Sequence, residues 1–329
     1  MSGQQLTGSS IDAVQCRGRK FYIKRDDQLS AGFAGNKARK LAYLLQDAPK
    51  NIDRIVSHGS VQSNFLYSLS VLAKQKQWAL DFYVDHVPSF LQQQPLGNYQ
   101  AALENGANIC LLSDMPSSSN NVATLEAITA EDQRSLFIPE GGRHQMAEWG
   151  ISVLAEEIVQ WAAGQNITKL TVMLPSGTGT TAFYLQKHVP FEVLTCACVG
   201  DDTYLKQQFL MLSQGQAKLP TILLPKKKYH FGKLYAEFFD MWEELRCETG
   251  IEFELLYDPL GWISLFEHIE NEMPAESDVL YIHQGGVLGN QSMLPRYLRR
   301  NDKQANIQSN NETTNNTKLK DVKGKNVAR

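Results

Sequence analysis

Short apolar runs alternate with amphipathic helical patterns along most of the chain, and Gly- or Ser-rich turns separate them. Some runs, such as residues 170–174 (LTVML), are apolar at nearly every position, which is typical of strands buried on both faces of a parallel sheet. Helical patterns lie between the runs, for example Phe65, Leu69 and Leu72 on one face. The candidate strands are residues 21–25, 54–57, 80–85, 108–113, 135–139, 169–175, 191–199, 253–257 and 279–283. This alternation predicts an α/β fold in which helices connect parallel strands.

The bulk properties exclude several classes of protein. A length of 329 residues predicts more than one packing unit, and a net charge of −3 offers no basic face for nucleic acid. The five scattered cysteines match no zinc spacing and are typical of thiols in a reducing compartment. The N-terminus has no apolar signal core, and no apolar run reaches the roughly 20 residues of a membrane helix. We therefore expect a cytoplasmic protein with no metal, membrane or nucleic-acid partner.

The last part of the chain differs from the rest. Residues 301–329 are rich in Asn and Thr and then in Lys, and they contain almost nothing that can be buried. We expect a disordered, solvated tail there.

Lys37 is the first candidate functional residue. It lies in the segment 35–41 (GNKARKL), where Asn36 can cap a helix and would place Lys37 in the first turn. A cation there opposes the positive end of the helix dipole, which should lower the pKa of the Lys37 amine. A neutral amine is what a Schiff base to an aldehyde requires. Taken alone, the segment favours an ordinary cluster of basic residues.

A second candidate site is the polar turn 58–64 (HGSVQSN), between a short strand and a helix. Ser63 or Asn64 can cap that helix. Their side chains and the backbone amides would face a ligand at the carboxyl end of the strand, where open α/β sheets place their sites. A polar cap with no ligand is equally consistent with this turn.

A third candidate site is the turn 175–181 (PSGTGTT), between a buried strand and a helix. Small residues let backbone amides approach an anion, the hydroxyl groups add donors, and the helix N-terminus adds its dipole. No Gly-Lys-Ser/Thr or G-x-G-x-x-G pattern is present, so neither a P-loop nor a dinucleotide site is predicted. The turn favours a phosphate site over an ordinary connection.

The three sites together suit a cofactor that has one aldehyde and one phosphate. Pyridoxal 5'-phosphate (PLP) meets this requirement, and Lys37 would carry its aldehyde. An unrelated α/β protein that binds another phosphate ligand is the alternative from a different class.

The same residues resemble a known family. Residues 24–27 (KRDD) and 35–41 closely resemble the K-R-D-D…G-N-K-x-R-K-L block of the 1-aminocyclopropane-1-carboxylate (ACC) deaminase and D-cysteine desulfhydrase family. Residues 59–64 (GSVQSN) resemble its G-x-x-Q-S-N block. Weaker matches are residues 177–182 (GTGTTA) to its phosphate loop and 283–286 (HQGG) to its H-T-G-G block. The blocks occur in family order and cover nearly the whole expected folded chain.

The resemblance implies a two-domain tryptophan-synthase-β-like PLP fold, called fold type II. Each domain would be an open twisted, mostly parallel sheet flanked by helices. Residues 1–51 and 161–300 would form the large PLP-binding domain, residues 52–160 an inserted small domain, and residues 301–329 the disordered tail. The resemblance also implies a homodimer.

The resemblance assigns roles to individual residues. Lys37 would be the Schiff-base lysine, and Asn64 would hydrogen-bond the phenolic oxygen of PLP. Ser63 would contact the substrate carboxylate or help to move a proton, with Gln62 beside it at the substrate. Gln284 would lie near the pyridine nitrogen. The phosphate would be held by Ser176, Gly177, Thr178, Gly179, Thr180 and Thr181.

The chain departs from the family at substrate-side and ring-side positions. The family segment D-P-V-Y-x-G-K is matched by residues 258–264 (DPLGWIS), so Gly261 stands where the family has a tyrosine and Ser264 where it has a lysine. Phe231 stands at a second tyrosine position, and Gln284 replaces the threonine of H-T-G-G. The missing phenols argue against authentic ACC deaminase chemistry, in which one such tyrosine is thought to drive ring opening.

The favoured function is a PLP-dependent lyase or deaminase (a hydrolase when the product is a keto acid and ammonia) in amino acid metabolism. Lys37, once freed from the cofactor, or Ser63 would act as acid and base. Elimination, hydrolytic deamination and racemisation of a small amino acid all stay open. The alternative is a PLP-binding family member with lapsed or much altered catalysis.

Overall fold

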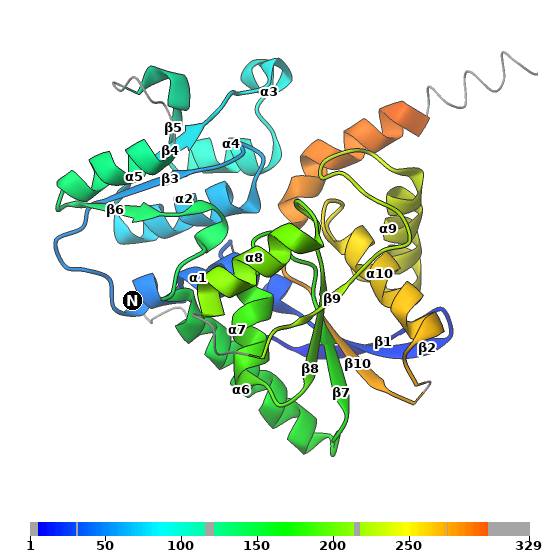
Figure 1. Cartoon of the computed structure of the whole chain (residues 1–329). Helices are drawn as coiled ribbons and strands as arrows, with labels where there is room; N and C mark the ends of the chain where they lie inside the picture. The colour runs from blue at the N-terminus through cyan, green and yellow to red at the C-terminus, as the bar shows by residue number, and fades with distance from the viewer. Residues whose placement is uncertain (1–5, 31, 116–121, 214–217, 275, 302–329) are drawn as a thin grey trace, which may run out of the picture.

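Two sheets organise the chain in a computed structural model (Figure 1). The larger sheet has the strand order β1-β2-β10-β7-β8-β9, and the smaller has the order β5-β4-β3-β6. Neighbouring strands pair in parallel except β1 and β2, which form an antiparallel hairpin at one edge. The described residues are 6–30, 32–115, 122–213, 218–274 and 276–301.

The elements have the following bounds. The larger sheet comprises β1 (Ile11–Cys16), β2 (Arg19–Lys24), β7 (Leu170–Met173), β8 (Glu192–Cys196), β9 (Thr221–Leu223) and β10 (Asp278–Ile282). The smaller sheet comprises β3 (Arg54–His58), β4 (Ala79–Val84), β5 (Asn108–Leu111) and β6 (Ser135–Ile138). The α-helices are α1 (Gly35–Gln46), α2 (Asn64–Lys76), α3 (Ser89–Gln93), α4 (Gly97–Glu104), α5 (Val122–Glu131), α6 (Ala147–Gly164), α7 (Thr180–His188), α8 (Asp202–Ser213), α9 (Ala236–Thr249), α10 (Asp258–Asn271) and an unlabelled helix over residues 290–301. Short 3-10 turns are η1 (Asp26–Gln28), η2 (Leu112–Asp114), η3 (Glu140–Gly142) and η4 (Val287–Gly289).

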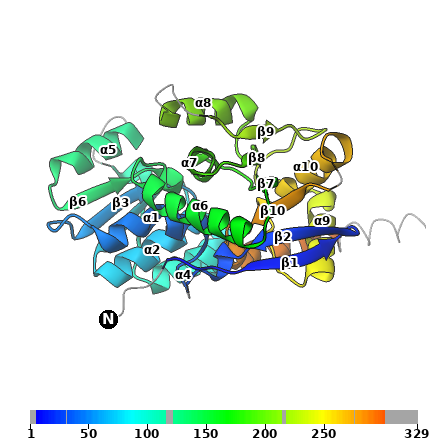
Figure 2. The ribbon, with the colours of Figure 1, turned by 90° about the horizontal axis from the view of Figure 1, so that it is seen from below.

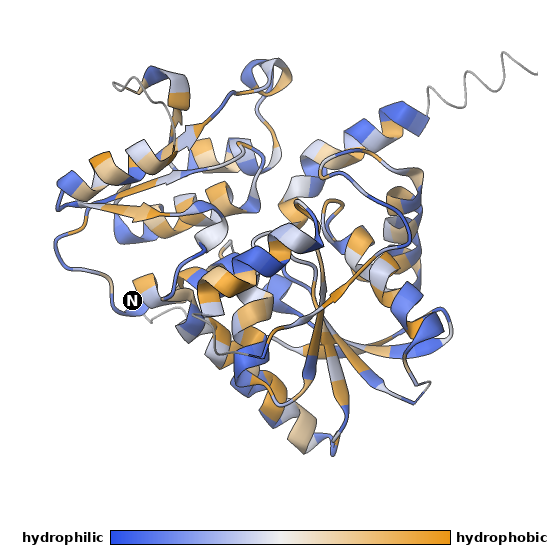
Figure 3. Cartoon of the chain, viewed as in Figure 1, coloured by the Kyte–Doolittle hydropathy of each residue, from blue (hydrophilic) through white to orange (hydrophobic). Residues whose placement is uncertain are grey.

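The larger sheet is covered by helices on both faces. Side chains of α9 and α10 form one apolar core with Phe21 and Leu194, and side chains of α6, α7 and α8 form another with Val172 and Leu280. Because both faces are buried, its central strands are apolar at successive positions, as Figure 3 shows. This explains why the continuous apolar runs of the sequence become parallel strands here.

The smaller sheet shares an apolar core with α1, α2 and α4. Helix α1 also lies side by side with α6, which packs on the larger sheet (Figure 2). The contact is close, because a Cβ added at Gly150 of α6 would lie 1.9 Å from the carbonyl oxygen of Arg39. The helix that carries Lys37 is therefore held between the two sheets. The division into residues 1–51, 52–160 and 161–300 stays a prediction.

The expected α/β architecture with mostly parallel sheets is confirmed, but three strand assignments were wrong or missing. Residues 253–257, expected as a strand, form none, because Glu254 turns back to accept backbone N–H groups at the start of α10. Strands β1 and β9 were missed, the first because only part of it is buried and the second because it has three residues. Apart from Asn301, the expected disordered tail lies outside the described residues. No helix among the described residues is long and apolar enough to cross a membrane.

Candidate active site

The strand order brings three of the predicted blocks together. Strand β10 lies between β2 and β7, so the loop after β10 lies between the Lys37 segment and the predicted phosphate turn. Gln284 in this loop contacts both neighbours. Its Oε1 accepts a hydrogen bond of 2.7 Å from Asn36 Nδ2, and its Nε2 donates one of 2.7 Å to the Pro175 carbonyl oxygen. The side chain of Gln284 thus ties the start of α1 to the phosphate turn.

The start of α1 approaches the loop after β10 without room for a side chain. Gly35 has φ +72°, and a Cβ there would lie 2.0 Å from the carbonyl oxygen of Gln284. The backbone N–H of Asn36 donates to that same oxygen over 3.1 Å. The expectation that Asn36 caps α1 is wrong: Ala34 is the cap residue, and Asn36 lies inside the first turn. Its side chain binds Gln284 instead.

A buried network of ion pairs holds α1 in place. Arg39 and Asp26 are almost fully buried and pair over 2.8 Å, and Arg39 also pairs with Glu157 of α6 over 2.8 Å. Lys24 donates to the other oxygen of Glu157 over 2.6 Å. Lys24 and Asp26 of the first sequence block, together with Arg39 and Glu157, therefore anchor the helix that carries Lys37.

Lys37 is partly buried in the first turn of α1. Burial lowers the pKa of its amine to about 8, and the nearby carboxylates of Glu140 and Glu254 oppose that shift. The sequence predicted a lowered pKa for Lys37, and this direction is confirmed. The main cause is the loss of solvating water on burial, rather than the helix dipole. The amine is thus neutral in a useful fraction of molecules near neutral pH.

A second amine lies beside Lys37. Lys40 is 3% exposed and donates to the Gly141 carbonyl oxygen over 2.9 Å. Burial and the charge of Lys37 hold the pKa of Lys40 well below its usual value. The contact also places η3, which follows β6 of the smaller sheet, next to the Lys37 helix.

The polar turn after β3 supplies a second wall of the site. Ser63 is the N-cap of α2, and its Oγ accepts from the backbone N–H of Leu66 over 3.2 Å. Asn64 is the first residue of α2, and its Nδ2 lies against the loop after β10, since a Cβ added at Gly286 would be 2.2 Å away. The Oε1 of Gln62 is buried and has no hydrogen-bond partner among the described residues. Gln62, Ser63 and Asn64 therefore lie together where α2 begins, and Asn64 brings this turn against the loop that contains Gln284.

The predicted phosphate turn, residues 175–181, has two parts that make different contacts. Ser176 is paired into the sheet, where its Oγ accepts from Thr195 over 2.7 Å and its backbone bonds to Cys196 and Cys198. Beyond it, the hydroxyl groups of Thr178 and Thr180 lie 3.0 Å apart. Ser176 therefore fixes the turn to the larger sheet, and Thr178 and Thr180 supply hydroxyl groups to the predicted anion site.

The start of α7 has the properties of an anion site. Gly179 is its cap residue with φ +72°, and no side chain among the described residues caps the helix. A Cβ at Gly179 would lie 2.6 Å from both Leu205 and Phe209, so α8 packs directly over this turn. Thr181 is 3% exposed, and its Oγ1 has no hydrogen-bond partner among the described residues. A buried, uncapped helix N-terminus with an unpaired hydroxyl suits a bound anion.

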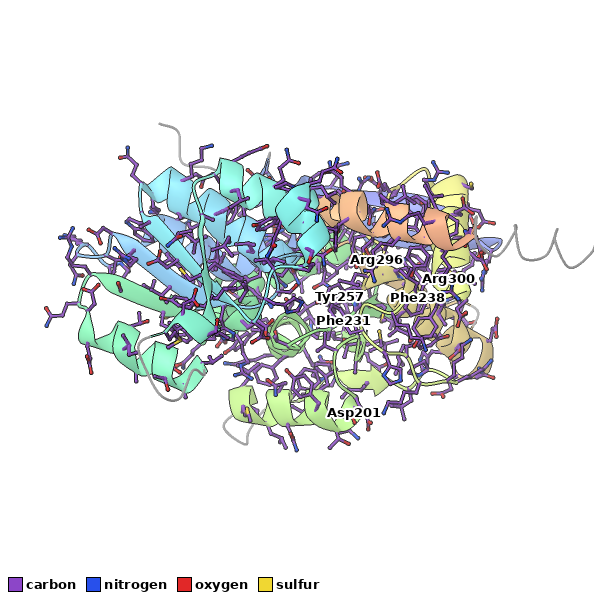
Figure 4. The ribbon with its side chains drawn as sticks, turned by 90° about the horizontal axis from the view of Figure 1, so that it is seen from above. Asp201, Phe231, Phe238, Tyr257, Arg296 and Arg300 are labelled. Carbon is purple, nitrogen blue, oxygen red and sulfur yellow. The ribbon has the colours of Figure 1, made fainter. Side chains whose placement is uncertain are left out.

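A phenol that sequence reasoning missed lies against the phosphate turn. A Cβ added at Gly177 would be 3.4 Å from both Oη and Cε1 of Tyr257. The ring of Tyr257 also lies beside Phe231, with ring centres 5.2 Å apart (Figure 4). Burial and the charge of Glu254 raise the pKa of Tyr257, so its hydroxyl stays a donor. The one sequence feature that could have indicated Tyr257 as a site residue is its position directly before the Asp258-Pro259 segment.

Glu254 is a second group that sequence reasoning missed. Its buried carboxylate accepts backbone N–H groups of Leu256, Tyr257 and Asp258 at the start of α10. Burial raises the pKa of Glu254, while those hydrogen bonds and the charge of Lys37 lower it. The carboxylate thus lies near enough to Lys37 for each to influence the ionisation of the other.

The position matched to the family tyrosine has no room for one. Gly261 is buried in α10, and a Cβ there would lie 2.6 Å from the hydroxyl of Tyr281 and 3.3 Å from Pro175. Helix α10 therefore packs closely on β10 and the phosphate turn at this point. The phenol of Tyr257, which precedes α10, approaches the same turn instead.

A separate group of possible metal ligands lies between β1 and α9. Atoms of Cys16, Glu244 and Glu248 lie within 4.8 Å of one another. Arg17 binds both carboxylates, with its Nε 2.6 Å from Glu244 and its backbone N–H 2.6 Å from Glu248. Burial raises the pKa of the Cys16 thiol to about 12. Arg17 thus already contacts both carboxylates, with its guanidinium on Glu244 and its backbone N–H on Glu248.

Comparisons with known proteins place these features in context. No protein-family model matches the chain. A D-cysteine desulfhydrase of Yersinia pestis (strain Pestoides F) is 28% identical over 298 residues, which cover 82% of this chain and 87% of that protein. The bifunctional D-cysteine desulfhydrase/1-aminocyclopropane-1-carboxylate deaminase of Arabidopsis thaliana, a mitochondrial protein, is 28% identical over 297 residues, covering 83% and 73%. The chain is related to these enzymes. The resemblance carried by the sequence blocks is thereby confirmed.

Solved structures agree on the fold. The crystal structure of an ACC deaminase homologue superposes with a TM-score of 0.73 at 22% identity, covering 90% of this chain and 95% of that one. The crystal structure of a threonine deaminase gives a TM-score of 0.61 at 14% identity, covering 86% and 92%. The expected tryptophan-synthase-β-like architecture, fold type II, is therefore the fold of this chain.

Proposed function

We propose that the protein is a PLP-dependent lyase or deaminase of a small amino acid, similar to D-cysteine desulfhydrases and ACC deaminases. The observation that carries the proposal is the bridge through Gln284, which binds Asn36 beside Lys37 on one side and Pro175 of the phosphate turn on the other. This side chain would hold the proposed reactive amine and the proposed anion site in a fixed relation. A molecule with one aldehyde and one phosphate needs both.

The residues present fit PLP. The unpaired Oγ1 of Thr181 and the uncapped start of α7 offer donors to a phosphate. Thr178 and Thr180 would add hydroxyl groups, and Gly177 and Gly179 let the backbone approach. Ser176 would hold the turn in place from the sheet.

Lys37 would hold the cofactor through its aldehyde, and Asn64 Nδ2 would donate to the phenolic oxygen. When bound, PLP supplies an electron sink for the carbon next to the amino group of the substrate. Lys37 would then take and return protons at that carbon, because its lowered pKa lets the amine exchange protons near neutral pH. Ser63 keeps its hydroxyl hydrogen free to donate to a substrate carboxylate, since its oxygen accepts from Leu66.

Gln62 and Gln284 would have different roles. The unpaired, buried Oε1 of Gln62 would accept a hydrogen bond from the substrate. Both ends of the Gln284 amide are already bonded, so we propose that it holds the ring site together and presents a neutral environment near the pyridine nitrogen. A neutral partner favours elimination over transamination.

The test combines absorbance with product detection. Purified protein incubated with PLP and then freed of unbound PLP should keep a visible absorbance band that is absent in Lys37→Ala, with Lys187→Ala of exposed helix surface as the matched control. A panel of D- and L-amino acids should then give ammonia and a keto acid, and sulfide when the substrate carries a thiol. A band with no turnover of any amino acid would favour the alternative of lapsed catalysis. Absence of a band would refute PLP binding, and an equal band in Lys37→Ala would refute Lys37 as the residue that carries the cofactor.

We further propose a homodimer, as the resemblance implies. Light scattering after gel filtration should give twice the chain mass for the protein with and without PLP. A monomer under both conditions would contradict this.

A further inference from the structure

Asn98, at the start of α4, binds the predicted cofactor ligand Asn64. Asn98 is 2% exposed, and its Nδ2 donates to the Asn64 Oδ1 over 2.8 Å and to the backbone carbonyl oxygen of Gln62 over 2.9 Å. The start of α4 is pressed on the loop after β10, since Gly97 has φ +60° and a Cβ there would lie 3.3 Å from the Leu288 carbonyl oxygen. Asn98 therefore lies where elements of both sheets meet.

The Gln62 carbonyl decides the orientation of both amides. A backbone carbonyl can only accept, so the group of Asn98 that faces it must be the NH₂ group. That same NH₂ group faces Asn64, which must then present its oxygen in return. The remaining group of Asn64, its Nδ2, is turned toward Gly286 and the site, and it donates to no acceptor among the described residues.

Asn98 keeps this position at a cost. Its own Oδ1 is buried without a partner among the described residues. A buried acceptor that lacks a partner lowers stability, so such groups call for an explanation beyond packing. Fixing the donor side of Asn64 toward the site supplies that explanation.

We propose that Asn98 is a positioning residue that locks the Asn64 amide with its N–H donor toward the cofactor, where it binds an oxygen that carries negative charge. This inference rests on the proposed function and deepens it. A donor at that place stabilises the ionised phenolic oxygen of PLP. An acceptor there would oppose it.

Asn98→Asp tests the polarity of this chain of contacts. A carboxylate has the shape of the amide but accepts only, so Asn64 would turn its NH₂ group toward residue 98 and its oxygen toward the cofactor. We expect the pH midpoint of the visible absorbance of the PLP-loaded protein to rise by about one unit, and the dissociation constant of PLP to rise roughly tenfold. Asn105→Asp, at the other end of α4, is the matched control, since Asn105 binds Ser70 and Lys74 and not Asn64.

The dependence on Asn64 separates positioning from general damage. In an Asn64→Ala background, Asn98→Asp should leave the absorbance midpoint unchanged. A shift of the same size there, or no shift in the Asn98→Asp single variant, would overturn the proposal. If Asn98→Asp does not fold, Asn98→Ala should give a smaller shift of the same sign. Failure of both variants to fold while Asn105→Asp folds would assign Asn98 a structural role and also overturn it.

The orientation of Asn64 can also be read without the cofactor. Side-chain amide NMR spectra of asparagine-labelled apoprotein should show the Asn64 NH₂ resonance moved in Asn98→Asp and unmoved in Asn105→Asp. Wild-type protein that takes up no PLP would refute the proposed function, while these spectra still decide the orientation. An unmoved Asn64 resonance in Asn98→Asp would refute the positioning role even if PLP binds.

Discussion

The reaction of Lys37 with an aldehyde should have a pH dependence set by its burial. Only the neutral amine attacks an aldehyde, and burial lowers the pKa of Lys37 from 10.5 to about 8. We therefore expect the rate of PLP uptake by the apoprotein to rise with pH up to about 8 and to level off above it.

The size of the effect follows from the same two values. At neutral pH about one-tenth of Lys37 amines would be neutral, against about one in 3,000 for an ordinary lysine, a difference of roughly 300-fold. The stability of the apoprotein should also rise with pH between about 8 and 10.5, because the unfolded chain binds more protons than the folded one in that interval. The unfavourable contribution of Lys37 is fully present below the lower value and absent above the higher one.

The assay mixes apoprotein with excess PLP from about pH 6 to about pH 10 and follows the visible absorbance in time. The rate of a blocked free lysine with PLP at each pH divides out the titration of the cofactor itself. Reduction and peptide mass spectrometry then confirm that Lys37 is the residue modified. Urea unfolding of wild type and Lys37→Met over the same range gives the stability, and the slope between the two pKa values should be absent in the variant.

A ratio of rates that stays constant up to pH 10 would refute the argument, because Lys37 would then have an ordinary pKa. Glu140→Gln provides a check on the cause. The Glu140 carboxylate raises the pKa of Lys37, so its removal should move the midpoint to lower pH. A midpoint that moves to higher pH would contradict the assigned electrostatics.

Three substitutions test the rest of the site. Gly35→Ala forces a Cβ within 2.0 Å of the Gln284 carbonyl oxygen. Urea unfolding should therefore show a loss of about 2–4 kcal/mol in the free energy of unfolding, and PLP titration should show a loss of more than tenfold in affinity. Unchanged stability would mean that the contact is not close. Thr181→Val removes a buried hydroxyl that has no partner among the described residues. The free energy of unfolding of the apoprotein should stay the same or rise by up to about 1 kcal/mol, while PLP affinity falls about tenfold. A loss of stability with unchanged PLP affinity would instead indicate a structural hydroxyl. Tyr257→Phe should leave thermal unfolding of the apoprotein unchanged and weaken PLP binding several-fold in fluorescence titration, because one phenolic donor over Gly177 is lost; equal affinity would exclude that hydroxyl from the phosphate site.

Local patterns in the sequence were enough for the architecture. Runs such as residues 170–174 can bury their apolar side chains only between two layers of helices, so the parallel sheet could be predicted from the runs themselves. The helix start at Ser63 also followed from a local rule, because a cap bonds within three residues. Strand β1 did not follow, because its side chains are mostly half-exposed and its edge position is set by pairing with β2.

The site needed contacts between distant segments. The sequence indicated Lys37 and the phosphate turn, but their connection through Gln284 spans more than a hundred residues and depends on β10 lying between β2 and β7. The lowered pKa of Lys37 was expected from the helix end and comes from burial, which no local pattern contains.

Site residues that lie outside a recognisable motif could not be predicted from the sequence. The phenol of Tyr257 reaches the phosphate turn only because Glu254 turns the backbone into α10, and the space for a side chain at Gly261 is taken by Tyr281. The sequence by itself determined the α/β fold, because that depends on periodicity, and it indicated the residue types of the candidate site. The tertiary structure alone decided which side chains line the site, because that depends on which strands are neighbours.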